Sequence, residues 1–311
     1  MQAITLLLAA GSAVKAYTIV EADLFMVKNI DPVVIPGQYK SHLHSFFGGD
    51  AVTINTKTSK ELQAGCTSAH NPNDFSSYWV PTLFALDGDK RTNVPFSRFS
   101  AYYVQIEHAE IAIPQDYKVV VGNSKATSQA DVEPLAGIEW FCEGDAGETK
   151  DKAAFPTKTC STHLQTLLLF HDCVNPTTLE SAYSGRHNGV DGNRCPPNMK
   201  RMPQLRFSIR YDLRKTLPNG WSGPPPLELA CGPSYCTHGD FINGWLPEAA
   251  ENMLKANSKR DFQEVVGPKG GDSPNAICPG KDADPSNGTS DYATSLKMMA
   301  KRALGRYDRR V

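Results

Sequence analysis

Residues 205–211 read Leu-Arg-Phe-Ser-Ile-Arg-Tyr, with an apolar side chain at every second position and polar side chains between them. Successive side chains of a β-strand point to opposite faces of the sheet, so this alternation predicts a strand with one buried face. Four more stretches rich in β-branched, aromatic or other apolar residues are also predicted strands: 79–84, 102–107, 117–121 and 164–170. We therefore expect a mainly β protein.

Glycine and proline, 24 and 22 residues, are spread along the chain and predict short elements joined by long loops. Together with the predicted strands, they favour a β-sandwich or jelly-roll-like domain with a few short helices. One helix is predicted over residues 247–256, which begin with proline and acidic residues. A second is predicted over residues 292–305.

The first residues have the pattern of a signal peptide. Residues 4–10 are a short apolar run, and Val14-Lys15-Ala16 ends in a small residue suited to cleavage. We expect a signal peptide over residues 1–16, a single β-rich domain over 17–256, and a polar, partly disordered tail over 257–311 that contains the second helix.

Composition narrows the location and the partners of the protein. Eight cysteines behind a signal peptide indicate four disulfides formed in the secretory pathway, so we expect a secreted, extracellular or cell-wall protein. Cys231 and Cys236 are close enough in sequence to pair with each other, and the other partners stay open. Asn287 lies in the one N-glycosylation motif.

The formal charge of −1 gives no electrostatic reason to bind nucleic acid. After the first residues, no stretch approaches the roughly 20 apolar residues of a membrane span. We expect a monomer.

Histidines beside glycine, aromatic and polar residues are the main candidates for chemistry. They occur in residues 41–49 (SHLHSFFGG), 185–189 (GRHNG) and 238–245 (HGDFINGW). His42 and His44 are two residues apart, so on a strand both rings project from one face. Imidazole acts as an acid or base near neutral pH and also binds metals.

Several motifs resemble a secreted, mainly fungal family known as domain of unknown function 1996. The resemblance lies in residues 30–37 (IDPVVIPG) with 41–49, in residues 66–68 (CTS) with 77–83 (SYWVPTL), in Cys195-Pro196 with 203–205 (PQL), and in residues 238–245. It implies secretion and, from relatives with an attached sugar-binding domain, a polysaccharide or cell-wall glycan as partner. This chain departs from the family at Asn29, at Val174 and near Ser184, where members often have arginine, tryptophan and a second histidine.

We therefore predict a groove lined by His42, His44, His187, His238 and Asp240 that cleaves or modifies a polysaccharide as a glycoside hydrolase or lyase. Two mechanisms are open. In one, Asp240 orients His238 as general base, and Tyr78 or another histidine donates a proton. In the other, a divalent metal on His42, His44 and His238 activates substrate or water.

The polar side chain of Asn243 and the rings of Tyr78 and Trp245 are predicted substrate contacts. No cofactor is indicated apart from this metal. Carboxylate pairs drawn from Asp31, Asp50, Asp74 and Asp240 also stay open. The alternatives to an enzyme are a non-catalytic polysaccharide-binding wall protein and a secreted metal-binding protein.

Overall fold

The computed structural model describes residues 16–145, 151–185, 194–255 and 261–307, the last with its side chains up to 300. Its larger sheet contains six strands, which are antiparallel except for the β17–β1 pair. In spatial order they are β17 (Asp261–Phe262), β1 (Ala16–Glu21), β7 (Phe96–Val104), β14 (Gln204–Tyr211), β10 (Leu164–Leu169) and β9 (Glu139–Cys142). The predicted strand at 205–211 is confirmed as part of β14, at the centre of this sheet.

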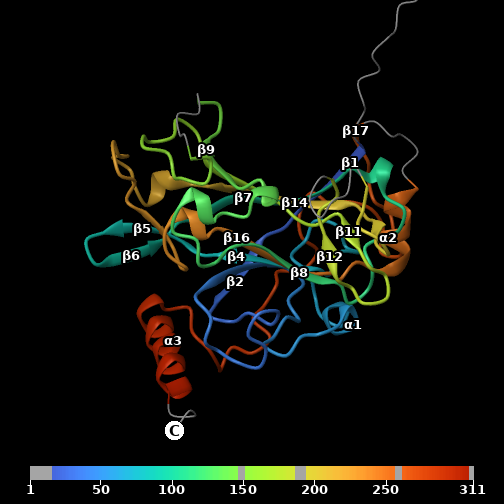
Figure 1. Cartoon of the computed structure of the whole chain (residues 1–311), viewed down its shortest axis with the longest axis horizontal. Coiled ribbons are helices and arrows are strands. Elements are labelled where there is room, and N and C mark those ends of the chain that lie inside the picture. Colours follow the sequence, from blue (N-terminus) through green and yellow to red (C-terminus); the bar gives the residue numbers. More distant parts are fainter. Residues whose placement is uncertain (1–15, 146–150, 186–193, 256–260, 308–311) are drawn as a thin grey trace, which may run out of the picture.

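A second sheet of five antiparallel strands packs against the first (Figure 1). Its order is β2 (Leu24–Lys28), β3 (His44–Gly48), β4 (Ser77–Pro81), β16 (His238–Ile242) and β8 (Lys118–Gly122). Inner-face rings of the two sheets interdigitate: Phe47 stacks on Phe99, and Tyr78 contacts Phe207. This is the β-sandwich that the alternating strands predict.

The outer face of the five-stranded sheet is also buried, which makes a second, smaller core. Phe46 and Trp79 project outward from β3 and β4 and stack with ring centroids 5.3 Å apart. Leu62 of helix α1 (Ser59–Gln63) packs there, under the loops that connect β2, β3 and β4. Thr58 and Glu61 form a capping box that starts α1. The functional candidates on β3 and β16 lie beside this outer core.

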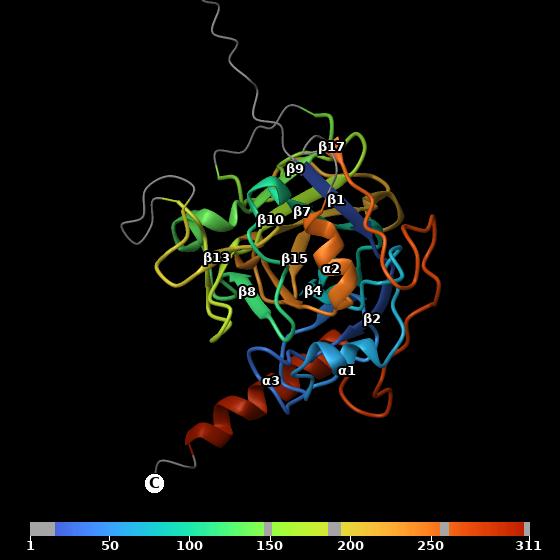
Figure 2. The same cartoon turned by 90° about the vertical axis from the view of Figure 1, so that its right-hand side faces the viewer.

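Smaller elements complete the fold. Two three-stranded sheets have the orders β15 (Leu227–Leu229), β5 (Leu83–Asp87), β6 (Lys90–Asn93) and β12 (Ser181–Ala182), β11 (Cys173–Val174), β13 (Lys200–Arg201). The short 3₁₀ helices are Ile106–His108, Gln129–Asp131, Pro134–Ala136, Leu213–Lys215 and Ser234–Cys236. Helix α2 (Pro247–Leu254) packs on the body, whereas the ribbon of α3 (Tyr292–Tyr307) extends away from it at its C-terminal end (Figure 2).

Most predicted elements exist, with shifted ends. The strand predicted over 79–84 is two strands, β4 and β5, that belong to different sheets and meet at Thr82. The strand predicted over 102–107 ends at Val104, because Gln105 takes a left-handed conformation (φ 57°) and starts a 3₁₀ turn. Both predicted helices form, as α2 and α3.

Four disulfides join all eight cysteines: Cys66–Cys278, Cys142–Cys160, Cys173–Cys195 and Cys231–Cys236. The first ties the segment after α2 to the body, and Lys28 and Asp282 form an ion pair with 2.7 Å between Nζ and Oδ2. The described part of this segment thus contacts β2. The disulfides suit an extracellular protein. Among the described helices, none combines the length and apolarity of a membrane span.

Candidate metal centre

The register of the five-stranded sheet places two histidines on either side of one proline. His44 on β3 pairs with Pro81 on β4. Across β4, Asp240 of β16 pairs with Trp79, so the antiparallel register brings His238 level with Pro81. Residues two apart share a face of a strand, and His44, His238 and Asp240 therefore project from the same outer face as Trp79.

Three imidazole rings meet above Pro81. His238 Nε2 lies 3.1 Å from Nε2 of His42 and 3.2 Å from Nε2 of His44. The rings of His42 and His44 have centroids 4.2 Å apart. His44 and His238 are fully buried, whereas His42 is half-buried and connects the cluster to the surface. The structure thus brings together three of the four histidines predicted from the sequence.

Backbone carbonyls determine the tautomers of the two buried rings. His44 Nδ1 donates to the carbonyl oxygen of Ile30 at 2.9 Å, and His238 Nδ1 donates to that of Cys236 at 2.7 Å. A carbonyl oxygen only accepts, so both Nδ1 atoms carry hydrogen and, in the neutral rings, both Nε2 atoms are acceptors. Two lone pairs therefore face each other across 3.2 Å, and a cation between them would relieve their repulsion.

A proton is a poor candidate for this cation at neutral pH. Burial lowers the pKa of His238 to about 4. Burial and the neighbouring rings lower the pKa of His42 and of His44 well below 6.5. All three rings are thus neutral under ordinary conditions, which is the form in which imidazole binds metal ions.

Asp240 adds a carboxyl group to the same place. It is fully buried, and neither of its oxygens has a hydrogen-bond partner among the described residues. Burial, with a contribution from Asp31, raises the pKa of Asp240 well above its usual value. One ligand atom each of His44, His238 and Asp240 lies within 4.8 Å of the others. A buried carboxyl group without a partner is costly, and metal coordination would satisfy it.

The expected role of Asp240 as the group that orients His238 differs from the observed geometry. The orienting acceptor on Nδ1 is the Cys236 carbonyl. Asp240 Oδ2 lies 3.9 Å from His238 Nε2, on the opposite side of the ring and beyond hydrogen-bond distance. Both groups point toward the same space and do not pair with each other.

Two nitrogen separations, from His238 to His42 and from His238 to His44, are close to those around a four-coordinate ion. With zinc–nitrogen bonds of about 2.0–2.1 Å and tetrahedral angles, ligand nitrogens are about 3.3 Å apart. The observed separations are 3.1 and 3.2 Å. Two further groups of ligand atoms contain Cys231 with His42 and His238, or Cys66 and Cys278 with Asp50. Their sulfurs are tied up in disulfides, so the histidine–aspartate group is the stronger candidate.

Residues 31–245 match the model of a protein family described as Domain of unknown function (DUF1996). The chain belongs to this family. His42, His44, His238 and Asp240 all lie inside the matched region. No curated protein and no solved structure matches the chain.

The structure places the predicted substrate contacts of this DUF1996 member in the core. Tyr78, Trp245 and Asn243 are fully buried. The hydroxyl groups of Tyr78 and Tyr103 are 2.6 Å apart, and Trp245 Nε1 donates to the Tyr103 hydroxyl at 2.9 Å. Asn243 Nδ2 donates to the carbonyl oxygen of Pro114 at 2.8 Å. No face of either ring is open to a sugar in this structure.

The glycines of the candidate motifs allow close packing of the chain. A Cβ on Gly48 would lie 2.1 Å from the carbonyl oxygen of Ser76, and one on Gly244 would lie 2.3 Å from that of Phe75. Both positions therefore accept only glycine because another strand or loop approaches there. The aromatic neighbours are held inside the fold by this approach.

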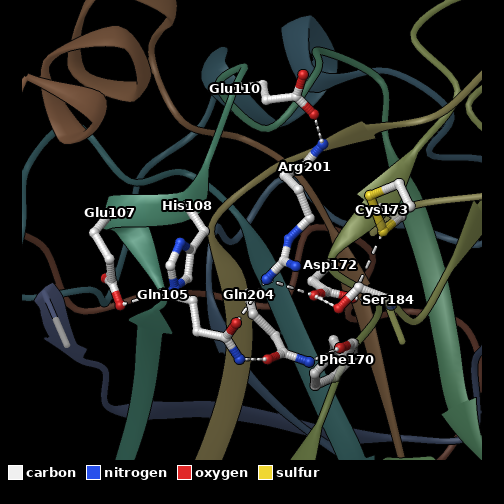
Figure 3. Close-up of polar contacts among 11 residues, drawn as sticks. Gln105, Glu107, His108, Glu110, Phe170, Asp172, Cys173, Ser184, Arg201 and Gln204 are labelled. Atoms are coloured by element: carbon white, nitrogen blue, oxygen red, sulfur yellow. Dashed lines mark hydrogen bonds and ion pairs between the residues drawn. A yellow bond between two sulfur atoms is a disulfide. The ribbon is translucent and has the colours of Figure 1, made fainter. Parts of the chain in front are cut away.

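His187 lies outside the described residues, and its place in the site stays a prediction. Contacts are described only for residues before and after the segment 186–193: Cys173 and Cys195 are bonded, and Ser184 donates from its backbone N and from Oγ to the Asp172 carboxylate, both at 2.6 Å. Asp172 also forms a buried ion pair with Arg201, 3.0 Å between Oδ2 and Nη2 (Figure 3).

Sequence reasoning missed two features of the centre. The carbonyls of Ile30 and Cys236, which orient His44 and His238, have no signature in side-chain chemistry. Cys231 was considered only as a disulfide partner, although its sulfur lies within 4.8 Å of ligand nitrogens of His42 and His238. The sequence offered one signal for both features: Cys236 lies two residues before His238, which places the Cys231–Cys236 loop beside this ring.

Proposed function

We propose that this protein binds a divalent transition metal through His44, His238 and Asp240, whose ligand atoms lie within 4.8 Å of one another, with His42 on the solvent side of the site. The observation that carries the proposal is the pair of Nδ1-protonated rings of His44 and His238, whose Nε2 lone pairs face each other at 3.2 Å. Imidazole and carboxylate ligands of this kind suit zinc, copper, iron or nickel better than magnesium or calcium.

The position of the centre supports a chemical role for the metal. His42 is half-buried, so the ligand set has one side near solvent. A zinc ion held by three protein ligands, here His44, His238 and Asp240, would keep an open position, where it would lower the pKa of bound water to about 7 and polarise substrate oxygens. We propose metal-assisted cleavage or modification of a polysaccharide as the reaction, on the basis of the family resemblance, with His42 nearest to the substrate.

Metal analysis tests the first part of this proposal. The chain is expressed through a secretory pathway, stripped with chelator, and titrated with Zn²⁺ and Cu²⁺ in competition with a metal-sensitive dye. We expect about one tightly bound ion per chain. His44→Ala and His238→Ala should lose it, whereas His108→Ala, whose side chain is 48% exposed, should bind as wild type does. The metal centre is refuted by wild-type protein that binds no ion, or by histidine variants that bind normally.

Product analysis tests the second part. Wild type and His238→Ala are incubated with fungal and plant polysaccharides, with and without chelator, and the products are examined for new reducing ends and unsaturated sugars. We expect products from metal-loaded wild type alone. Turnover that survives both chelator and substitution would contradict a metal-assisted reaction.

A surface hollow favours polysaccharide binding without catalysis as a second candidate function. Its volume is about 290 Å³, and its lining includes Glu21, His70, Phe262 and Asp272. Phe262 is 47% exposed and lies edge-on to Tyr17, which stacks on Tyr102. Small-molecule sites are typically lined by aromatic rings together with a few polar groups, as this hollow is. Under this function Phe262→Ala abolishes glycan binding and His238→Ala does not; unchanged binding by Phe262→Ala would exclude the hollow.

A further inference from the structure

A disulfide sulfur lies at the edge of the proposed metal centre. Cys231 Sγ is within 4.8 Å of a ring nitrogen of His42 and of His238. It is bonded to Cys236, five residues later, whose carbonyl oxygen accepts from His238 Nδ1. The same short loop therefore orients one ligand and holds a second potential ligand in oxidised form.

We infer that Cys231 is a latent ligand that changes the metal preference of the centre when the Cys231–Cys236 bond is reduced. The inference rests on the proposed metal centre. With the disulfide intact the donors are nitrogen and oxygen. After reduction, Cys231 supplies a thiolate, and the centre selects thiophilic ions such as Zn²⁺ and Cu⁺.

The distances allow this change without refolding. Around an ion with zinc–sulfur bonds of about 2.3 Å and zinc–nitrogen bonds of about 2.0–2.1 Å, sulfur and nitrogen are about 3.5 Å apart at tetrahedral angles. Because Cys231 Sγ already lies within 4.8 Å of a nitrogen of His42 and of His238, it must approach these two nitrogens by little more than about 1 Å at most, which a free thiol achieves by rotation about its Cα–Cβ bond. Cys231 is half-buried and Cys236 is buried, so Cys231 is the more accessible of the two sulfurs.

The reductant is a dithiol, small or protein-borne. One of its thiolates attacks a sulfur of the Cys231–Cys236 bond and forms a mixed disulfide, and its second thiol then closes its own disulfide and releases the cysteine. Two electrons and two protons pass to Cys231 and Cys236. The Cys231 proton is released to water when its sulfur binds the metal ion.

Two single substitutions form a matched test, because both break the disulfide. Cys236→Ser leaves a free thiol on Cys231, beside the histidines, and Cys231→Ser leaves it on Cys236. Each variant and the oxidised wild type are loaded with Co²⁺, and the near-ultraviolet spectrum is recorded for thiolate-to-cobalt charge transfer. We expect this band in Cys236→Ser and its absence in Cys231→Ser and oxidised wild type.

Wild type treated with a mild dithiol provides a measurement that needs no substitution. Bound Co²⁺ or Zn²⁺ should slow alkylation of Cys231, as located by peptide mass, and should leave the rate of alkylation of Cys236 unchanged. Identical cobalt spectra for the two variants, or equal alkylation of Cys231 with and without metal, would overturn the inference. Failure of oxidised wild type to bind Co²⁺ would instead refute the proposed metal centre itself.

Discussion

Replacing His238 by glutamine should change how the stability of the metal-free protein depends on pH. His238 is fully buried between two other imidazoles and donates from Nδ1 to the Cys236 carbonyl. Burial lowers its pKa from 6.5 to about 4. The unfolded chain therefore binds this proton more readily than the folded chain does, and stability falls as the pH drops from 6.5 toward 4.

The linkage relation gives the size of the effect. A group with a pKa of 6.5 unfolded and about 4 folded loses about 2 kcal/mol of its contribution to folding between pH 7 and pH 5. Buried carboxyl groups act in the opposite direction: burial raises the pKa of Asp74 to about 6, so its folded form gains protons over the same interval. The difference between wild type and His238→Gln removes these shared contributions.

The assay is urea unfolding with the disulfides intact and a chelator present, at pH 7 and pH 5. We expect wild type to lose about 2 kcal/mol more than His238→Gln between the two pH values. His108→Gln is the control, because its ring is 48% exposed, and it should follow wild type. If wild type and His238→Gln lost equal stability, the buried neutral imidazole would be refuted, and with it the argument that two lone pairs face each other.

Three further predictions concern other parts of the fold. Asp240→Val should stabilise the chelated protein by about 1–3 kcal/mol in urea unfolding, because a buried carboxyl group without a partner is removed, and should weaken metal binding; a less stable variant would contradict this. Gly239→Ala should lower the free energy of unfolding by about 1–3 kcal/mol, since its Cβ would lie 2.7 Å from Leu168 Cδ1 and 2.9 Å from Phe170 Cζ; an unchanged Tm would show that the core can yield. Replacing Cys142 and Cys160 together by alanine should cost about 3 kcal/mol for a loop of 18 residues and leave metal binding intact; loss of the metal would mean that this disulfide also positions the centre.

The strands and helices were the most predictable features. The alternation of residues 205–211 corresponds to β14 because the apolar face of that strand is fully buried, whereas Arg206 and Arg210 on the polar face are only partly buried. Strands buried on both faces, such as β3 and β4, carry no alternation, and the boundary between β4 and β5 at Thr82 was invisible for that reason. The number of disulfides, four, was predictable from the eight cysteines. Of the individual pairs, the spacing of the cysteines suggested only Cys231–Cys236.

Within the site, two-residue spacing correctly placed His42 and His44 close together, and the order of residues within β16 placed His238 and Asp240 on one face. Side-chain chemistry was a poor guide to exposure. Tyr78 and Trp245 are aromatic residues of the kind that stack on sugar rings. However, the backbone approaches closely at Gly48 and Gly244, and both rings are enclosed in the core. Their burial depends on contacts between residues far apart in the chain, which local patterns do not contain.

The local pattern of residues was thus enough to predict a mainly β, disulfide-bonded DUF1996 domain and to select three histidines that lie together in the fold. The meeting of three imidazoles above Pro81 came from strand register, because β3 and β16 are almost 200 residues apart in the chain and become neighbours of β4 only through long-range pairing. The carbonyl groups of Ile30 and Cys236 bind Nδ1 of His44 and His238, so that Nε2 of each ring faces the centre. The direction of these carbonyl groups depends on the folded backbone. The proposed metal binding depends on those distances and tautomers, and no single motif encodes either.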